Sequence, residues 1–268
     1  VLRLFLPNRL IDIFALVWIK KKMKISHLIS GTDKSIINSL FVTGCIKISI
    51  CQNNLSQKYS LSKLKAYEKM NLSLLRKGFN NSDYKFSVSD GVQKSMIEFN
   101  VKNEIFRTRN CVDTDYFFRE NHLPTSTIRL INIGNLIEQK NQKLLLRIVK
   151  RLKAENFKVA LDILGDGELK AELNQYIREL DLGENVNLLG FISKDVYLKT
   201  LKSADIFVLT SKYEGMPLAL LEAMSIGLPI VANDCESGPR EILDNGMFGK
   251  LIEFNNEEFF VKAIKDVS

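Results

Sequence analysis

The second half of the chain alternates between short apolar runs and longer segments with helical spacing. Between the runs, apolar side chains recur on one helical face, as they do in helices that cover a sheet. The apolar runs occupy residues 128–134, 158–164, 186–189, 205–209 and 229–233, and the helical segments occupy 141–153, 168–180, 195–203 and 217–226. This alternation predicts an α/β fold: a parallel sheet with helices on both faces and a ligand site beyond the carboxyl ends of its strands.

The first half shows the same alternation less completely. Residues 24–30 and 46–51 have strand character, a helix is expected near 33–43, and 61–79 has a helical pattern. Residues 84–99 predict a strand followed by a helix, with Ser89 as the N-cap. The opening strand and helix units of a doubly wound domain are missing from this pattern.

Composition and charge fit two globular domains with different surfaces. The 268 residues are 46% hydrophobic and 26% charged, which excludes disordered and collagen-like chains. Residues 1–126 hold 20 basic and 10 acidic side chains, a net charge of +10, whereas residues 127–268 hold 18 and 21. We expect a partial N-terminal Rossmann-like domain over 1–118, a linker over 119–127 and a C-terminal Rossmann-like domain over 128–268.

Metal and disulfide chemistry are not expected from the cysteine and histidine content. The four cysteines and two histidines show no metal-ligand spacing and no CxxC pair. A reducing compartment therefore fits the sequence.

The residues that follow the apolar run 205–209 carry the strongest chemical signal. Pro217 suits the first position of a helix, and the helix over 217–226 is apolar on every side except at Glu222. Such a helix is expected to be buried, and a buried carboxylate needs donors, which the ribose hydroxyls of a ligand would supply. A structural alternative is that Glu222 binds a backbone group or a lysine. The free N–H groups of Gly215, Met216 and Leu218, at the helix start, suit a phosphate.

Together these residues resemble the signature of the retaining glycosyltransferases of family 4. Glu214 and Glu222 are separated by seven residues and followed by AMSIGLPIVA. The flanking stretches occur in the family's order: SVSDGV (87–92), RNCVDTDYF (109–117), INIGNLIEQKNQ (131–142), DILGDGELKAEL (162–173), NVNLLGF (185–191) and DCESGPREIL (234–243). The resemblance implies a GT-B fold, a pair of Rossmann-type domains, here with the N-terminal domain incomplete and the sequence cut short at both ends.

The resemblance also implies a role for each site residue. Glu222 would hold the ribose hydroxyls of the donor, and Glu214 would lie beside the donor sugar as a catalytic residue. Lys140 would neutralise the diphosphate, assisted by the backbone amides of 215–218. The remaining donor-binding positions are Gly134 and Asn135 in the first loop, and Phe191 and Ile192 beside the nucleobase. Asn135 stands where the family usually has arginine, so one of two expected cations is absent.

The implied activity is sugar transfer from a nucleotide diphosphate sugar to a growing surface glycan of the polysaccharide, O-antigen or capsule type, with retained anomeric configuration. The acceptor would be a glycan or a lipid-linked glycan, and no metal or other cofactor is expected. The alternative is a catalytically inactive remnant that at most binds nucleotide. An NAD-dependent enzyme is a third hypothesis, which GDGELK (165–170) weakens because it lacks the third glycine of the dinucleotide fingerprint.

A basic cluster near the N-terminus suggests where the enzyme works. Lys20, Lys21, Lys22 and Lys24 follow an apolar stretch with Phe14 and Trp18, and such a segment suits an anionic membrane surface. A nucleic acid partner is not expected, because no aromatic residues interleave with the lysines. We expect a cytoplasmic protein, peripheral on the inner face of the membrane. The competing interpretation packs Phe14 and Trp18 inward and leaves the lysines as a solvated helix end.

Overall fold

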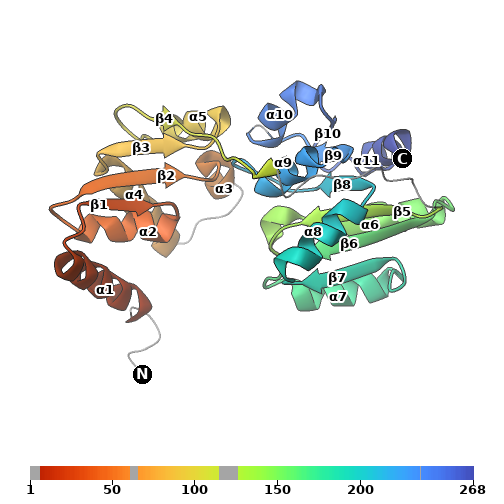
Figure 1. Ribbon diagram of the computed structural model, residues 1–268, viewed down its shortest axis with the longest axis horizontal. Coiled ribbons are helices and arrows are strands. Elements are labelled where there is room, and N and C mark those ends of the chain that lie inside the picture. The colour runs from red at the N-terminus through yellow and green to blue at the C-terminus, as the bar shows by residue number, and fades with distance from the viewer. Residues whose placement is uncertain (1–6, 61–65, 115–125, 236) are drawn as a thin grey trace. The chain divides into compact units, whose positions relative to one another are not determined.

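A computed structural model describes residues 7–60, 66–114, 126–235 and 237–268 (Figure 1). The chain divides into two compact units, Val1–Arg109 and Asn110–Ser268. The expected linker over 119–127 lies largely outside the described residues.

The first unit is built on a four-stranded parallel sheet with strand order β1-β2-β3-β4. Its strands are β1 (His27–Ser30), β2 (Ile46–Cys51), β3 (Tyr84–Ser87) and β4 (Phe106–Arg107), and its helices are α1 (Pro7–Met23), α2 (Asp33–Asn38), η1 (Ser39–Phe41), α3 (Leu55–Ser60), α4 (Ala66–Asn80) and α5 (Asp90–Glu98). Ser89 caps α5 as predicted, since its side chain accepts a hydrogen bond from the Val92 amide.

Helices α2 and α4 pack closely against one another in this unit. A Cβ at Gly78 of α4 would lie 2.6 Å from the carbonyl oxygen of Ile36, so only glycine allows this approach. Ile36, Leu75 and Phe79 are buried at the contact. The helix expected near 33–43 is shorter than predicted, because an α-helix gives way to a 3₁₀ turn at Ser39.

The second unit contains a six-stranded sheet with strand order β10-β9-β8-β5-β6-β7, in which every pairing is parallel. Its strands are β5 (Ile128–Ile133), β6 (Val159–Leu164), β7 (Val186–Gly190), β8 (Ile206–Leu209), β9 (Ile230–Asn233) and β10 (Lys250–Ile252). Its helices are η3 (Glu138–Lys140), α6 (Gln142–Ala154), α7 (Lys170–Glu179), α8 (Lys194–Ser203), α9 (Leu218–Ser225), α10 (Pro239–Ile242), η4 (Asp244–Gly246) and α11 (Glu257–Val267).

Side-chain alternation along the strands gives this sheet a core on each face. Ile206 and Val208 of β8 pack with residues of α6, α7 and α11, whereas Phe207 and Leu209 pack with residues of α8 and α9. A strand buried on both faces is apolar throughout, which is why these strands appear as continuous apolar runs in the sequence. The predicted sheet with helices on both faces is confirmed.

The order of the strands creates a switch point between β5 and β8. The chain runs outward from β5 through β6 to β7, and then returns across the sheet to β8, which pairs with the other side of β5. The loops that leave β5 and β8 therefore diverge to opposite faces at one place on the carboxyl edge. In open α/β sheets this is where ligands bind.

None of the helices within the described residues combines the length and the apolar character that a bilayer crossing requires.

Candidate functional site

Lys140 lies in the loop that follows β5 at the switch point. The loop ends in the 3₁₀ turn Glu138–Lys140, and the left-handed backbone of Asn141 (φ 51°) then redirects the chain into α6. A Cβ at Gly134 would lie 3.2 Å from Cε of Lys140. Glycine at this position therefore leaves room for the lysine side chain to lie along the strand end.

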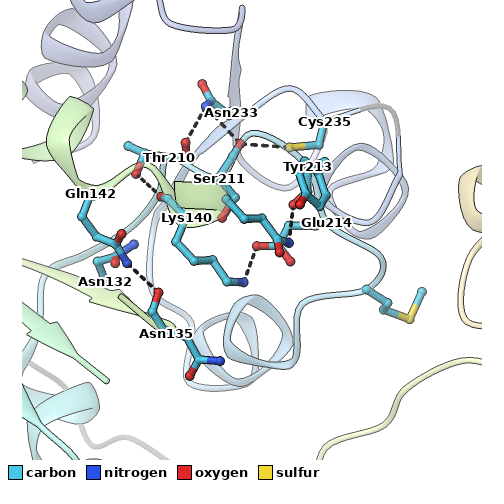
Figure 2. A network of polar contacts seen from close by, with 12 residues as sticks. Asn132, Asn135, Lys140, Gln142, Thr210, Ser211, Tyr213, Glu214, Asn233 and Cys235 are labelled. Carbon is cyan, nitrogen blue, oxygen red and sulfur yellow. Dashed lines mark hydrogen bonds and ion pairs between the residues drawn. The ribbon is translucent and has the colours of Figure 1, made fainter. Parts of the chain in front are cut away.

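Glu214 comes from the loop after the neighbouring strand β8 and meets Lys140. The Lys140 ammonium lies 2.6 Å from Oε1 of Glu214, and the two side chains are 18% and 6% exposed. Figure 2 shows the extended lysine side chain directed at this carboxylate. The two residues predicted to be catalytic thus form one shielded ion pair, and removal of either partner would leave the other charge poorly compensated.

Hydrogen bonds join the two loops beyond this ion pair. The Lys212 amide donates to the Gln139 carbonyl at 2.8 Å, and the Gln139 side chain donates to the Tyr213 carbonyl at 2.8 Å. The Thr210 hydroxyl also donates to the Lys140 carbonyl at 3.1 Å. One of these bonds joins the two backbones and the other two run from a side chain to a backbone carbonyl, so the loops that carry the ion pair are held together by more than its charges.

Side chains at the end of β9 and in the segment that follows it support the β8 loop from the other side. The Asn233 amide group donates to the Thr210 and Ser211 carbonyls at 2.8 and 3.1 Å (Figure 2). The Ser237 hydroxyl donates to the Glu214 carbonyl at 2.7 Å. Burial, together with the charges of Glu214 and Asp234, raises the pKa of the Cys235 thiol. This cysteine therefore stays neutral and serves packing rather than nucleophilic chemistry.

The turn over 165–170 packs its backbone against the Lys140 loop. A Cβ at Gly165 would lie 2.2 Å from the Gly134 carbonyl oxygen, and one at Gly167 would lie 2.5 Å from the Leu136 carbonyl oxygen. The Leu136 amide donates to the Asp166 carbonyl at 3.0 Å. The predicted tight turn is confirmed, and its glycines permit contact between two loops.

The phosphate site predicted at the start of α9 keeps its free amides. Pro217 is the N-cap rather than the first helical residue, and the helix begins at Leu218. Among the described residues, no acceptor receives the N–H groups of Gly215, Met216 or Leu218. The Asn110 side chain donates to the Met216 carbonyl at 2.9 Å and fixes this turn.

The expectation that α9 is buried on every side is wrong. Leu220 and Ala223 are buried in this helix, but Leu218 is 48% exposed and Glu222 is partly exposed. Although almost every position is apolar, one face packs against β8 and β9 and shields only the residues that point inward. Apolar composition alone does not show how many faces of a helix are covered.

Glu222 has a partner that the sequence did not indicate. The Tyr197 hydroxyl of α8 donates a hydrogen bond to Oε2 of Glu222, so the protein partner is a tyrosine and not the backbone group or lysine of the structural alternative. Burial, followed by the bond to the carboxylate, raises the pKa of Tyr197 and keeps the phenol protonated. Tyr197 precedes Glu222 by 25 positions on a different helix, and no local spacing links the two.

The other predicted donor-binding residues are distributed along the carboxyl edge. Asn135 is exposed in the β5 loop, and its carbonyl accepts a hydrogen bond from the Gln142 side chain at 3.0 Å. Phe191 and Ile192 follow the edge strand β7, where Phe191 is 81% exposed and Ile192 packs partly into the core. The structure brings Lys140, Glu214 and Gly134 together, and it places Phe191 separately, just after the edge strand β7.

The sequence is similar to glycosyltransferases of two microorganisms. A glycosyltransferase of Methanocaldococcus jannaschii is 48% identical over 42% of this chain and 27% of its own length. The N-acetylgalactosamine-N,N'-diacetylbacillosaminyl-diphospho-undecaprenol 4-alpha-N-acetylgalactosaminyltransferase of Campylobacter jejuni is 36% identical over 51% of this chain and 36% of its own length. The chain thus spans well under half the length of these curated relatives.

The fold is similar to that of TarM from S. aureus. The crystal structure of a TarM point mutant with Fondaparinux, alpha-GlcNAc-glycerol and UDP superimposes with a TM-score of 0.80 at 20% identity, over 96% of this chain and 52% of TarM. This likeness confirms the predicted GT-B fold class. Residues 113–268 match the family described as Glycosyl transferases group 1. The chain therefore belongs to the group 1 glycosyl transferases.

Proposed function

We propose that the protein transfers a sugar from a nucleotide diphosphate sugar to a growing surface glycan, with retention of the anomeric configuration. The observation that carries the proposal is the shielded Lys140–Glu214 pair at the switch point, next to the free amides of Gly215, Met216 and Leu218. A cation and a helix N-terminus on one sheet edge suit a diphosphate. The Campylobacter jejuni relative is by name an N-acetylgalactosaminyltransferase whose acceptor is a sugar on diphospho-undecaprenol, which supports the same substrate class.

Lys140 and the amides would act on the leaving group. Negative charge builds on the diphosphate as the bond to the sugar breaks, and fixed donors that face this charge lower the barrier. Glu214 already orients the Lys140 ammonium and would lie beside the donor sugar. The acceptor would attack from the face that the diphosphate leaves, which gives retention.

Asn135 makes this site less cationic than its family resemblance suggests. An asparagine can donate a hydrogen bond to a phosphate oxygen but brings no charge. Lys140 and the amides would therefore carry most of the stabilisation, and we propose weaker donor binding rather than inactivity. A folded but inactive relative is the competing hypothesis, which Asn135 favours.

The remaining donor contacts follow from the same arrangement. Glu222 would accept hydrogen bonds from the ribose hydroxyls, and exposed Phe191, with Ile192, would flank the nucleobase. We propose that no divalent metal is needed, because Lys140 and the amides supply the positive potential at the diphosphate. Activity that persists in excess EDTA would support this part, whereas activity restored only by added Mg²⁺ or Mn²⁺ would contradict it.

We also propose that α1 rests on the anionic, cytoplasmic face of a membrane, where a lipid-linked acceptor would lie. Phe14 and Trp18 are 72% and 60% exposed, so the inward packing considered from the sequence does not hold. The other side of α1 faces α2, where Asp12 pairs with Lys34 at 2.5 Å. The outward face thus combines aromatic side chains with Lys21 and Lys22, which suits anionic headgroups.

Incubation of the full chain with nucleotide sugars tests the activity. Transfer or donor hydrolysis is expected, and Glu222→Ala should lower kcat/KM by about tenfold or more, since it removes bonds to a charged acceptor. Proton NMR of a freshly formed product should show the anomeric configuration of the donor. Turnover unchanged in Glu222→Ala would contradict the assignment, and an inverted product would contradict retention.

A further inference from the structure

The Glu222 carboxylate has one oxygen held by the protein and one that is open. Oε2 receives the Tyr197 hydroxyl, whereas Oε1 has no hydrogen-bond partner among the described residues. Glu222 is partly exposed, so a ligand can reach Oε1. A carboxylate on a three-bond side chain samples several orientations unless one oxygen is fixed.

Tyr197 is itself held in place by its helix and by the core. Ser193 caps α8 by accepting a hydrogen bond from the Val196 amide, one residue before the tyrosine. The Tyr197 ring packs against the buried cluster that also contains Leu220 and Ala223 of α9. The hydroxyl therefore approaches Glu222 from a helix that is fixed against the same sheet face.

We propose that Tyr197 is a positioning residue for donor binding: its hydroxyl fixes Oε2 of Glu222 so that Oε1 accepts from a ribose hydroxyl of the nucleotide. This inference rests on the proposed function and adds a specificity determinant on α8. Because the phenol remains protonated, it acts as a donor across the working pH range. The purely structural alternative is that the same bond only clamps α8 to α9.

The test compares UDP with 2′,3′-dideoxyuridine diphosphate by calorimetry on the full chain. The ratio of the two affinities measures the ribose contribution within each variant, so it does not depend on the folded fraction of the preparation. Tyr197→Phe should reduce this ratio by about fivefold, the size of one modest hydrogen bond, and Glu222→Gln should reduce it further. Tyr176→Phe is the matched control and should leave the ratio unchanged, because no hydrogen bond of that hydroxyl is found among the described residues.

The outcomes separate the two proposals. The positioning role would be overturned if Glu222→Gln lowers the affinity ratio but Tyr197→Phe leaves it unchanged, because Tyr197→Phe then weakens the binding of both ligands equally or not at all. The proposed function would still stand. A ratio that Glu222→Gln does not change, or no UDP binding by the wild type, would overturn the ribose role of Glu222 and the positioning role with it.

Discussion

At the residue scale, the central feature is a lysine and a glutamate that neutralise one another before any substrate arrives. Lys140 and Glu214 lie 2.6 Å apart in a shielded position, so each charge depends on the other. An incoming diphosphate would share the ammonium with Glu214 instead of meeting a free cation. The carboxylate would thus keep Lys140 oriented in both states.

Replacing only one residue of this ion pair should lower the free energy of unfolding. Replacing both residues should lower it less, because no unpaired charge is then left buried. Lys140→Met leaves the Glu214 carboxylate buried without its cation and should lower the free energy of unfolding by about 3 kcal/mol. The double variant Lys140→Met with Glu214→Gln should recover a large part of this loss. Urea denaturation of the single and double variants measures the coupling. Strictly additive losses would show that the two side chains do not interact.

Buried thiols should make the protein less stable at alkaline pH. Burial raises the pKa of Cys51 to about 12, from an ordinary value of 9.0. Below pH 9 the thiol is neutral in both folded and unfolded chains, but between pH 9 and 12 it ionises only when unfolded. The free energy of unfolding should therefore fall by about 1.4 kcal/mol per pH unit for such a thiol.

Cys51→Ala tests this dependence. Denaturation midpoints between pH 8 and 10.5 should fall less steeply in Cys51→Ala than in the wild type, whereas Cys111→Ala, at an exposed position, should follow the wild type. Parallel curves for Cys51→Ala and the wild type would mean that the buried thiol does not contribute.

At the element scale, the turn between β6 and α7 supports the Lys140 loop through backbone contact. Gly165→Ala places a methyl group 2.2 Å from the Gly134 carbonyl oxygen, at a φ of +131° that side chains rarely adopt. We expect a loss of more than about 2 kcal/mol in stability, together with weaker nucleotide binding because the loop shifts.

The matched control for this prediction is Gly183→Ala. A Cβ at Gly183 meets no atom within 4 Å, so both stability and binding should stay close to the wild type. Thermal unfolding and UDP titration of the two variants check the prediction. Equal stability and equal UDP affinity of Gly165→Ala and Gly183→Ala would show that the site does not need the close contact between the 165–170 turn and the Lys140 loop.

Elements buried on both faces were predicted well from the sequence. Strands β5, β6, β8 and β9 lie inside the sheet, and they begin and end within one residue of their predicted positions. Strands β8 and β9 are buried at every position, which requires continuous apolar character. Strands β4 and β10 were not predicted, since two or three residues at the edge of a sheet carry too little pattern. Helix α11 was not predicted either, although it packs on the core through Phe260 and Ile264.

The site residues that lie in sequence motifs were predictable. The contacts that depend on how helices pack against one another were not. Lys140 and Glu214 were identified because each follows an apolar strand in a recognisable motif, and the parallel sheet brings those strand ends together. Tyr197 was missed because its contact with Glu222 depends on how two helices pack on one sheet face. The exposure of Leu218 was missed for the same reason.

At the scale of the whole molecule, the uneven charge distribution should direct binding to membranes. Residues 1–126 carry a net charge of +10, and α1 presents exposed aromatic side chains beside its lysines. We expect co-sedimentation with vesicles that contain anionic lipid, and binding that weakens as salt rises past physiological strength.

The double variant Phe14→Ser with Trp18→Ser should bind vesicles more weakly than the wild type, because it loses the apolar contact with the membrane. The matched control, Met247→Ser with Phe248→Ser at exposed positions of the second unit, should bind vesicles as the wild type does. Equal binding to neutral and anionic vesicles, or binding insensitive to salt, would contradict the membrane proposal.

The account as a whole depends on a nucleotide diphosphate binding at the switch point through Lys140. Calorimetric titration of UDP in the absence of divalent metal measures this directly. We predict binding by the wild type and by Lys143→Met, a control at an exposed lysine of α6. We predict a loss of at least about tenfold for Lys140→Met and for the double variant with Glu214→Gln, in which the ion pair is replaced by neutral side chains. UDP affinity that is the same in the wild type and in both Lys140 variants would contradict the account.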